Sequence, residues 1–259
     1  MPELVPYERC PLCESDRIAA LRTGHCGNHP LYKPVLSPQM RWVRCEACAH
    51  VFRDGYYTEE MCRVIFAGTN ECQKVGYDIE GQRFVSAHIV EKVLPFKSSG
   101  IWLDVGFGNG SLLFTAQEYG FTPMGIDLRM QNVEMLRSLG IDAFCRDIRS
   151  LEPEAPCSVI SMADVLEHMP FPKEALKAAH SLLTDGGVLF VSMPNSENLL
   201  WKSLDAANSN PFWGELEHYH NFSRSRLYSL LDEFGFKPRL YGVSERYRVS
   251  MEVVAPKDR

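Results

Sequence analysis

The chain has 259 residues, of which 45% are hydrophobic and 23% charged, which is typical of a globular protein with one full core and a small accessory unit. Its formal charge of −6 argues against broad binding to nucleic acid or to an anionic membrane, because both require a basic surface. No apolar run approaches the roughly 18 residues that span a bilayer, and the N-terminal residues lack the pattern of a signal peptide. We therefore expect a cytoplasmic protein without a membrane segment.

Four of the nine cysteines form two CxxC pairs, Cys10 with Cys13 and Cys45 with Cys48, and 31 residues separate the pairs. Two thiolates at this spacing can face one metal ion, and two such turns complete a tetrahedral site that suits Zn²⁺ and has no open position. We therefore predict a zinc-ribbon-like domain over residues 1–55, in which a structural Zn²⁺ replaces a hydrophobic core.

Two alternatives stay open for this segment. The pairs could be reduced thiols without a metal, or a residue of the set His25, Cys26 and His29 could replace one cysteine ligand. The remaining cysteines have no partner at a useful spacing, and we expect buried thiols at Cys62, Cys72, Cys145 and Cys157.

Residues 56–98 carry apolar side chains at helical intervals, from Met61 to Leu94, with an interruption at 76–78. The polar stretch Ser98–Gly100 marks the start of another segment. We predict a helical linker or lid over 56–98 and a further domain over 99–259.

Short apolar runs and helical patterns alternate after residue 99, which predicts a parallel sheet with helices on both faces. The last two strands are separated by too little chain for a helical crossover and should pair antiparallel. The predicted fold class is α/β, with a seven-stranded, mostly parallel, doubly wound (Rossmann-like) sheet whose last strand is antiparallel. The expected strands are 101–105, 123–127, 142–147, 158–162, 187–192, 237–243 and 248–254, and the expected helices are 111–119, 130–139, 172–183 and 223–234.

Three acidic residues lie at the carboxyl ends of three successive predicted strands, namely Asp104, Asp127 and Asp147. Ligands of such sheets bind beyond the carboxyl ends of the strands. The loop Gly106–Gly110 reads GxGxG, and a carboxylate beside it repels a pyrophosphate but attracts a cation. This charge pattern favours S-adenosylmethionine, which has a ribose and an adenine but no phosphate, over a dinucleotide.

Four segments in this order resemble a class I S-adenosylmethionine-dependent methyltransferase: Leu103–Gly110, Gly125–Asp127, Arg146–Asp147 and Ala163–His168. The resemblance covers residues 100 to about 255 and implies methyl transfer by in-line displacement. The N-terminal unit resembles the zinc-binding head of some bacterial methyltransferases, including sugar C-methyltransferases. Those sugar enzymes carry a closely spaced His-Glu-His segment, whereas this chain has Glu217-His218-Tyr219-His220.

The resemblance implies a role for individual residues on both sides of the reaction. Asp127 would bind the ribose, Asp147 with Ile148 the adenine, and Met162 with Ala163 would lie under the sulfonium. The full donor-binding prediction is Asp104, Gly106, Phe107, Gly108, Gly110, Asp127, Leu128, Asp147, Ile148, Met162 and Ala163. The catalytic candidates on the acceptor side are His168, His218 and His220 as bases, with Glu217 and Tyr77 as orienting groups.

The predicted acceptor is a small molecule, such as a sugar or a secondary metabolite. One alternative is an RNA-modifying methyltransferase that grips RNA with the zinc unit, and another is a non-catalytic interaction module that retains the fold. An aromatic-rich insertion after the fifth strand predicts either a region that sets substrate specificity or a hydrophobic lid or oligomer contact. Its aromatic residues are Trp201, Phe212, Trp213 and Tyr219.

Overall fold

The computed structural model describes residues 4–65 and 71–258, and its contacts divide the chain into two compact units. Unit 1 comprises Met1–Gly68, Glu167–Lys173 and Pro194–Leu230, and unit 2 comprises Thr69–Leu166, Glu174–Met193 and Leu231–Arg259. The division at residues 55 and 98 stays a prediction, because contacts alone do not show which segments fold independently.

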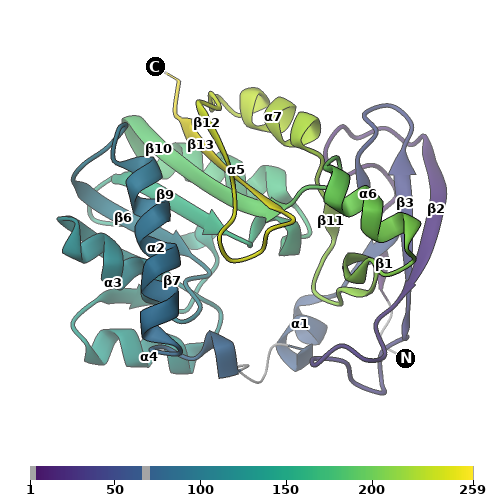
Figure 1. Ribbon diagram of the computed structural model, residues 1–259, viewed down its shortest axis with the longest axis horizontal. Coiled ribbons are helices and arrows are strands. Elements are labelled where there is room, and N and C mark those ends of the chain that lie inside the picture. Colours follow the sequence, from purple (N-terminus) through teal and green to yellow (C-terminus); the bar gives the residue numbers. More distant parts are fainter. Residues whose placement is uncertain (1–3, 66–70, 259) are drawn as a thin grey trace. The chain divides into compact units, whose positions relative to one another are not determined.

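Unit 2 is built on a seven-stranded sheet in the order β12-β13-β10-β9-β6-β7-β8 (Figure 1). Strands β6 to β10 pair parallel, and β12 pairs antiparallel with β13. The predicted fold class is therefore confirmed. The strands are β6 (Gly100–Val105), β7 (Phe121–Ile126), β8 (Asp142–Phe144), β9 (Cys157–Ala163), β10 (Leu183–Pro194), β12 (Leu240–Val243) and β13 (Ser250–Pro256).

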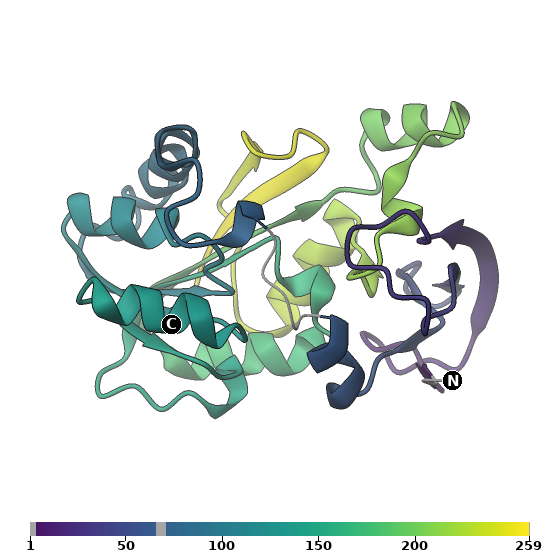
Figure 2. The ribbon, with the colours of Figure 1, turned by 90° about the horizontal axis from the view of Figure 1, so that it is seen from below.

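Helices cover both faces of this sheet, with α2 and α3 on one face and α5 on the other (Figure 2). A proline begins α5, where its fixed φ suits the first turn and its missing N–H costs no hydrogen bond. The helices within unit 2 are α2 (Ile79–Val93), α3 (Ser111–Glu118) and α4 (Met130–Ser138). Two further helices, α5 (Pro172–Leu182) and α7 (Arg224–Glu233), begin in unit 1 and end in unit 2.

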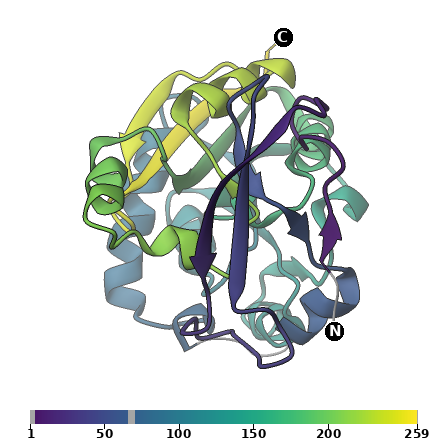
Figure 3. The ribbon, with the colours of Figure 1, turned by 90° about the vertical axis from the view of Figure 1, so that its right-hand side faces the viewer.

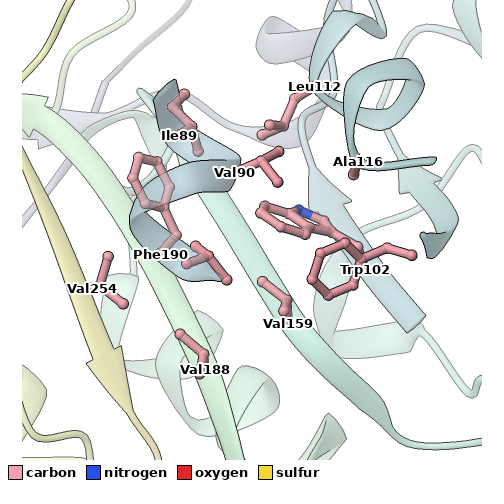
Figure 4. Close-up of a cluster of buried hydrophobic side chains, with 11 residues drawn as sticks. Ile89, Val90, Trp102, Leu112, Ala116, Val159, Val188, Phe190 and Val254 are labelled. Carbon is pink, nitrogen blue, oxygen red and sulfur yellow. The ribbon is translucent and has the colours of Figure 1, made fainter. Parts of the chain in front are cut away.

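The core beneath α2 and α3 centres on Trp102 of β6, which is fully buried (Figure 4). Its ring meets Phe121 edge-on at 4.9 Å between centroids. Side chains of Val90, Leu112 and Phe190 pack in the same cluster. Burial of a tryptophan side chain contributes on the order of 5 kcal/mol, so this cluster holds β6 and the loop that follows it in place.

Unit 1 contains a four-stranded antiparallel sheet in the order β11-β4-β3-β2, and Figure 3 shows its two long strands, β2 and β3. Strand β11 comes from the 194–230 segment and pairs with β4 through His220 opposite Phe52. The later segment therefore completes a sheet that begins near the N-terminus. The elements are β1 (Val5–Pro6), β2 (Ile18–His25), β3 (Gln39–Cys45), β4 (Val51–Arg53), β5 (Gly55–Tyr56), α1 (Glu59–Ile65), α6 (Leu199–Ala206) and β11 (His220–Asn221).

The aromatic insertion belongs to the core of unit 1. Trp201, Trp213 and Tyr219 are buried. The Trp42 indole N–H donates to the Trp213 carbonyl oxygen at 2.9 Å, and the two rings meet edge-on at 5.7 Å. The prediction of a lid or oligomer contact is therefore wrong for these three residues, because they fill the interior that the small sheet cannot fill alone.

The predicted helical stretch contains α1, a short 3₁₀ helix at Glu71–Gln73 and α2, and the predicted interruption at 76–78 is confirmed. Part of that stretch, residues 66–70, lies outside the described residues. The expectation of buried thiols holds for Cys157 but is wrong for Cys72, which is exposed, while Cys62 and Cys145 are half-buried. No helix among the described residues combines the length and the apolar character that a bilayer crossing requires.

Candidate functional site

The loop that connects β6 to α3 carries three glycines with positive φ, Gly106 at 67°, Gly108 at 53° and Gly110 at 77°. Residues with a Cβ are strained in this region, so the GxGxG spacing provides the conformation that the turn requires. The Gly106 N–H donates to the Ile126 carbonyl oxygen at 2.7 Å, which ties the loop to the end of β7. The turn therefore exposes backbone at the carboxyl end of the sheet, where ligands of this fold class bind.

Asp104 lies in β6 directly before this loop and is almost fully buried. Its Oδ1 accepts a hydrogen bond of 2.6 Å from the Ser161 hydroxyl, which itself accepts the Trp102 indole N–H at 2.9 Å. Burial raises the pKa of Asp104 to about 7, although the Ser161 hydrogen bond and the Arg246 charge act in the opposite direction. This carboxyl group therefore changes charge near neutral pH.

Asp127 follows β7 and connects two strand-end loops. One carboxylate oxygen accepts the Gly108 N–H at 3.2 Å, and the other accepts the Arg129 N–H at 2.8 Å and the Arg129 guanidinium at 3.4 Å. A carboxylate has about four acceptor positions, so capacity remains for a ligand hydroxyl. Leu128, the next residue, has a side chain that is 65% exposed and offers an apolar surface beside the carboxylate.

Asp147 caps the 3₁₀ helix Ile148–Ser150 by accepting the Arg149 N–H at 2.8 Å. Its carboxylate also pairs with the Arg149 guanidinium, which reaches Glu174 at 2.6 Å. Ile148 is buried. A ligand amine at Asp147 would therefore share the carboxylate with Arg149.

The other predicted donor residues frame the same strand ends. Phe107 is buried against Leu113 and Val133 in a second core cluster. Met162 is buried in β9, and Ala163 is half-buried at the end of that strand.

Two histidines of unit 1 form a buried pair, His50 with His220. The His220 Nε2 lies 3.0 Å from the Met169 carbonyl oxygen, and its Nδ1 lies 3.0 Å from the His50 Nε2. Because a carbonyl oxygen only accepts, the His220 Nε2 carries the hydrogen and its Nδ1 accepts from His50. Burial lowers the pKa of His220 to about 4. Both ring nitrogens of His220 are thus engaged within the protein.

A second group in unit 1, which we call the His–Glu cluster, consists of Glu167, His168 and His218. One ligand-type atom from each residue lies within 4.8 Å of the others. The two imidazole rings meet edge-on at 4.6 Å between centroids. Burial, followed by the charge of His168, lowers the pKa of His218 well below its usual value, so this imidazole is neutral at pH 7.

Glu217 and Tyr77, the predicted orienting groups, lie in different units. Glu217 is half-buried and belongs to a neighbouring group with His29 and Glu215, in which His29 bonds the Glu215 carboxylate. Tyr77 is 39% exposed. It follows Gly76, whose N–H donates to the Asn109 carbonyl oxygen of the glycine loop at 3.1 Å.

The four cysteines of the CxxC pairs lie together in unit 1, with Cys10 Sγ 3.7 Å from Cys48 Sγ and Cys13 Sγ 3.5 Å from Cys45 Sγ. Four sulfurs at about 2.3 Å from one tetrahedral ion lie about 3.8 Å apart. The observed separations therefore fit Zn²⁺. Hydrogen bonding with Cys10 lowers the pKa of Cys48, which favours a thiolate in the group.

The two CxxC turns have equivalent backbone geometry. In each, the N–H four residues after the first cysteine bonds that cysteine's carbonyl oxygen at 2.9 Å, from Glu14 to Cys10 and from Ala49 to Cys45. Glu14 and Ala49 both have positive φ, at 63° and 59°. Such a repeated turn, formed by unrelated sequences, indicates that both pairs are shaped to face one ion.

The alternative ligands have other partners. The Cys26 thiol donates to the carbonyl oxygens of Ser37 and Pro38, and the His25 ring accepts the Gly27 N–H. His29 bonds Glu215, as described above.

Residues 58–240 match the sequence model of a family described as methyltransferase domain, and the match covers more than half of the chain. The chain belongs to the class I S-adenosylmethionine-dependent methyltransferases. The matched range excludes residues 1–57, which carry the four cysteines.

The curated relatives of this methyltransferase include the ubiquinone biosynthesis O-methyltransferase of Idiomarina loihiensis, 35% identical over 107 residues. That alignment covers 38% of this chain and 44% of the relative. A second relative, the ubiquinone biosynthesis O-methyltransferase of Coxiella burnetii, is 29% identical over 113 residues, and the alignment covers 48% of that relative. The chain thus spans less than half the length of these curated relatives.

Two solved structures share the fold of this methyltransferase. One is the 1,6-didemethyltoxoflavin-N1-methyltransferase of Burkholderia thailandensis, solved with bound 1,6-didemethyltoxoflavin and S-adenosylhomocysteine. Its TM-score is 0.58 at 17% sequence identity, and the alignment covers 81% of this chain and 96% of the Burkholderia chain. The other is the magnesium protoporphyrin IX methyltransferase of Synechocystis PCC 6803, solved with bound SAH. Its TM-score is 0.55 at 18% sequence identity, and the alignment covers 70% of this chain and 84% of the Synechocystis chain.

Sequence reasoning about this methyltransferase missed three polar residues that shape the donor side: Ser161, Asn109 and Asn132. The Asn132 amide donates to the Gly108 carbonyl oxygen at 3.0 Å and to the Gln73 carbonyl oxygen at 2.9 Å. It therefore ties the glycine loop to the segment before α2. No sequence pattern signals this role, because the burial of Asn132 in the first turn of α4 is visible only in the structure.

Proposed function

We propose that this chain transfers the methyl group of S-adenosylmethionine to a small-molecule acceptor. The observation that carries the proposal is the hydrogen bond from the Gly108 N–H to Asp127, which joins the glycine loop to the acid at the next strand end. Asp104, buried under the same loop, adds a second carboxyl group. Two acids and three glycines with positive φ suit a cationic nucleoside without phosphate. The relatives named above for ubiquinone biosynthesis and 1,6-didemethyltoxoflavin support a small acceptor.

The donor, when bound, supplies a methyl group on a sulfonium, and the residues of the chain position it. Asp127 would accept the ribose hydroxyls, with Leu128 packing beside them. Asp104 and the loop Gly106–Gly110, with Phe107, would hold the methionine end. Asp147 and Ile148 would bracket the adenine, and Met162 and Ala163 would lie near the sulfur.

On the acceptor side, we assign activation of the nucleophile to His168 and His218. Both histidines lie in one cluster, and burial lowers the pKa of His218 well below its usual value. His220 is the weaker candidate, because Met169 and His50 occupy its two nitrogens. Glu217 would orient His168, whose Nδ1 lies 3.1 Å from the Glu217 carbonyl oxygen, and Tyr77 stays a candidate for orienting the acceptor.

At the four cysteines we propose a structural Zn²⁺. Four thiolates close the coordination sphere, so this ion has no open position for the acceptor. Its role is to hold the two CxxC turns, and through them the small sheet of unit 1.

We expect donor affinity to rise with pH, because Asp104 becomes charged as the pH passes its pKa of about 7. Below that pH the carboxyl group is neutral and loses its attraction for a cation. Calorimetry between about pH 5.5 and 7.5 should show a roughly tenfold gain in donor affinity, which is the change in free energy that corresponds to one pKa unit. Asp104→Asn should flatten this profile, whereas Ser161→Ala, which removes a hydrogen bond that lowers the pKa, should shift it to higher pH. An equal pH dependence in Asp104→Asn would contradict the role of this carboxyl group.

The test of the proposed function follows a labelled methyl group. The purified protein is incubated with methyl-labelled S-adenosylmethionine and either a pool of bacterial small metabolites or total RNA. We expect label in the small-molecule fraction and none in RNA, with Asp127→Ala as the inactive control. Label in RNA alone would favour the RNA-modifying alternative, and donor binding without transfer to either pool would favour the non-catalytic module.

A further inference from the structure

The His–Glu cluster has the composition of a metal-binding set. Glu167, His168 and His218 offer one carboxylate and two imidazoles, and their ligand-type atoms lie within 4.8 Å of one another. Donors bound at about 2.1 Å to one ion lie about 3.0–3.5 Å apart, so a bound cation would need to draw the three groups closer together than the 4.8 Å limit. All three residues belong to unit 1.

The orientation of His168 is that of a metal ligand. Its Nδ1 lies 3.1 Å from the Glu217 carbonyl oxygen, so Nδ1 carries the hydrogen and Nε2 keeps its lone pair. Histidines that bind metals usually donate their other ring N–H to a backbone carbonyl or a carboxylate, which fixes the tautomer and the ring orientation. The Glu217 carbonyl provides this second contact.

His218 supplies an independent observation. The residue is 5% exposed, and its Nδ1 is buried without a hydrogen-bond partner among the described residues. A buried polar atom of this kind destabilises the folded protein unless a partner satisfies it. His218 therefore combines this buried, unpartnered ring nitrogen with membership of a group whose ligand-type atoms lie within 4.8 Å of one another, which indicates that a ligand completes the group.

We propose that Glu167, His168 and His218 bind a second divalent cation, separate from the ion at the four cysteines. Two imidazoles and a carboxylate suit Zn²⁺, Fe²⁺, Co²⁺ or Mn²⁺. Three protein ligands leave coordination positions open, unlike the closed four-cysteine site. An acceptor oxygen in an open position would lose its proton more readily, and this role, though not the binding itself, rests on the proposed function.

Cobalt titration of the zinc-loaded, full-length protein tests the site without donor or acceptor. We expect one further equivalent of Co²⁺ with visible d–d absorption but no thiolate-to-cobalt charge-transfer band, because the ligands are nitrogen and oxygen. His168→Ala and Glu167→Gln should weaken Co²⁺ binding by more than about 100-fold. Loss of a residue that only hydrogen-bonds a metal ligand costs up to about 100-fold, so loss of a ligand itself should cost more. The matched control is His29→Ala, which changes a neighbouring histidine outside the cluster.

The zinc content of each variant reports folding, since one equivalent at the four cysteines shows that unit 1 is intact. Absence of further Co²⁺ in the wild-type protein, or unchanged binding in His168→Ala, would overturn the proposal. Loss of Co²⁺ binding in His29→Ala, with Co²⁺ binding retained in His168→Ala, would also overturn the proposal. That result would place the ion at the group formed by His29, Glu215 and Glu217. Because no donor is present, failure of this test and failure of methyl transfer are separate results.

Discussion

Removing the Zn²⁺ that we propose at the four cysteines should unfold the small sheet of unit 1. We expect Cys45→Ser, or chelation of the wild-type protein, to abolish bound zinc and the ordered packing around Trp42. Structural Zn²⁺ binding contributes about 10–16 kcal/mol in small zinc domains, which exceeds the stability that a sheet of this size can supply. Metal analysis and tryptophan fluorescence provide the measurement. Three of the four tryptophans, Trp42, Trp201 and Trp213, lie in unit 1, so their emission should shift to the red.

The matched control is Cys72→Ser, which changes an exposed cysteine of unit 2. It should leave both zinc content and fluorescence unchanged. Native tryptophan emission in metal-free Cys45→Ser would show that the cysteines are not needed for the fold of unit 1, and the zinc assignment would fail.

Asp127→Ala should weaken the binding of S-adenosylmethionine by about 100-fold, because two hydrogen bonds to a charged group are lost at about 1.5 kcal/mol each. The substitution also releases the Gly108 N–H, so the loop loses an anchor. Isothermal calorimetry with the donor gives the affinity, and thermal unfolding checks that unit 2 stays folded.

Asp142→Ala serves as the control, since Asp142 is an exposed acid at the start of the neighbouring strand β8. It removes the same charge from unit 2 without touching the loop. Equal affinity in Asp127→Ala and wild type would refute the ribose assignment.

The parallel sheet could be predicted because its signals are local. Strands β6 and β7 are each followed by a helix of the expected period, as in the apolar run Ile101–Val105 before Ser111–Glu118. The CxxC spacing is equally local, and the structure brings both pairs together. Asp104 and Asp127 could be placed at strand ends for the same reason, since the position of an acid near the end of an apolar run is visible in the sequence.

The composition of unit 1 could not be predicted, because it depends on contacts between distant residues. Strand β11 has only two residues, and its partner β4 lies about 170 positions earlier in the chain. No local pattern distinguishes a buried Trp213 from an exposed one. Likewise, the pairing of Asp147 with Arg149, and of Arg149 with Glu174, depends on side-chain directions that the sequence does not record.

The discontinuous build of unit 1 has a consequence for dissecting the enzyme. The Cys45 N–H bonds the His50 carbonyl oxygen, the His50 ring bonds His220, and His218 lies two residues away. A fragment that begins at residue 58, where the family match begins, would lack β4, the strand that pairs with β11. It would also expose the part of Trp213 that contacts Trp42. Such a truncation would expose hydrophobic surface and remove the contacts that hold the segment with His218 and His220 in place. Its insolubility or inactivity would therefore say nothing about the chemistry of the intact protein.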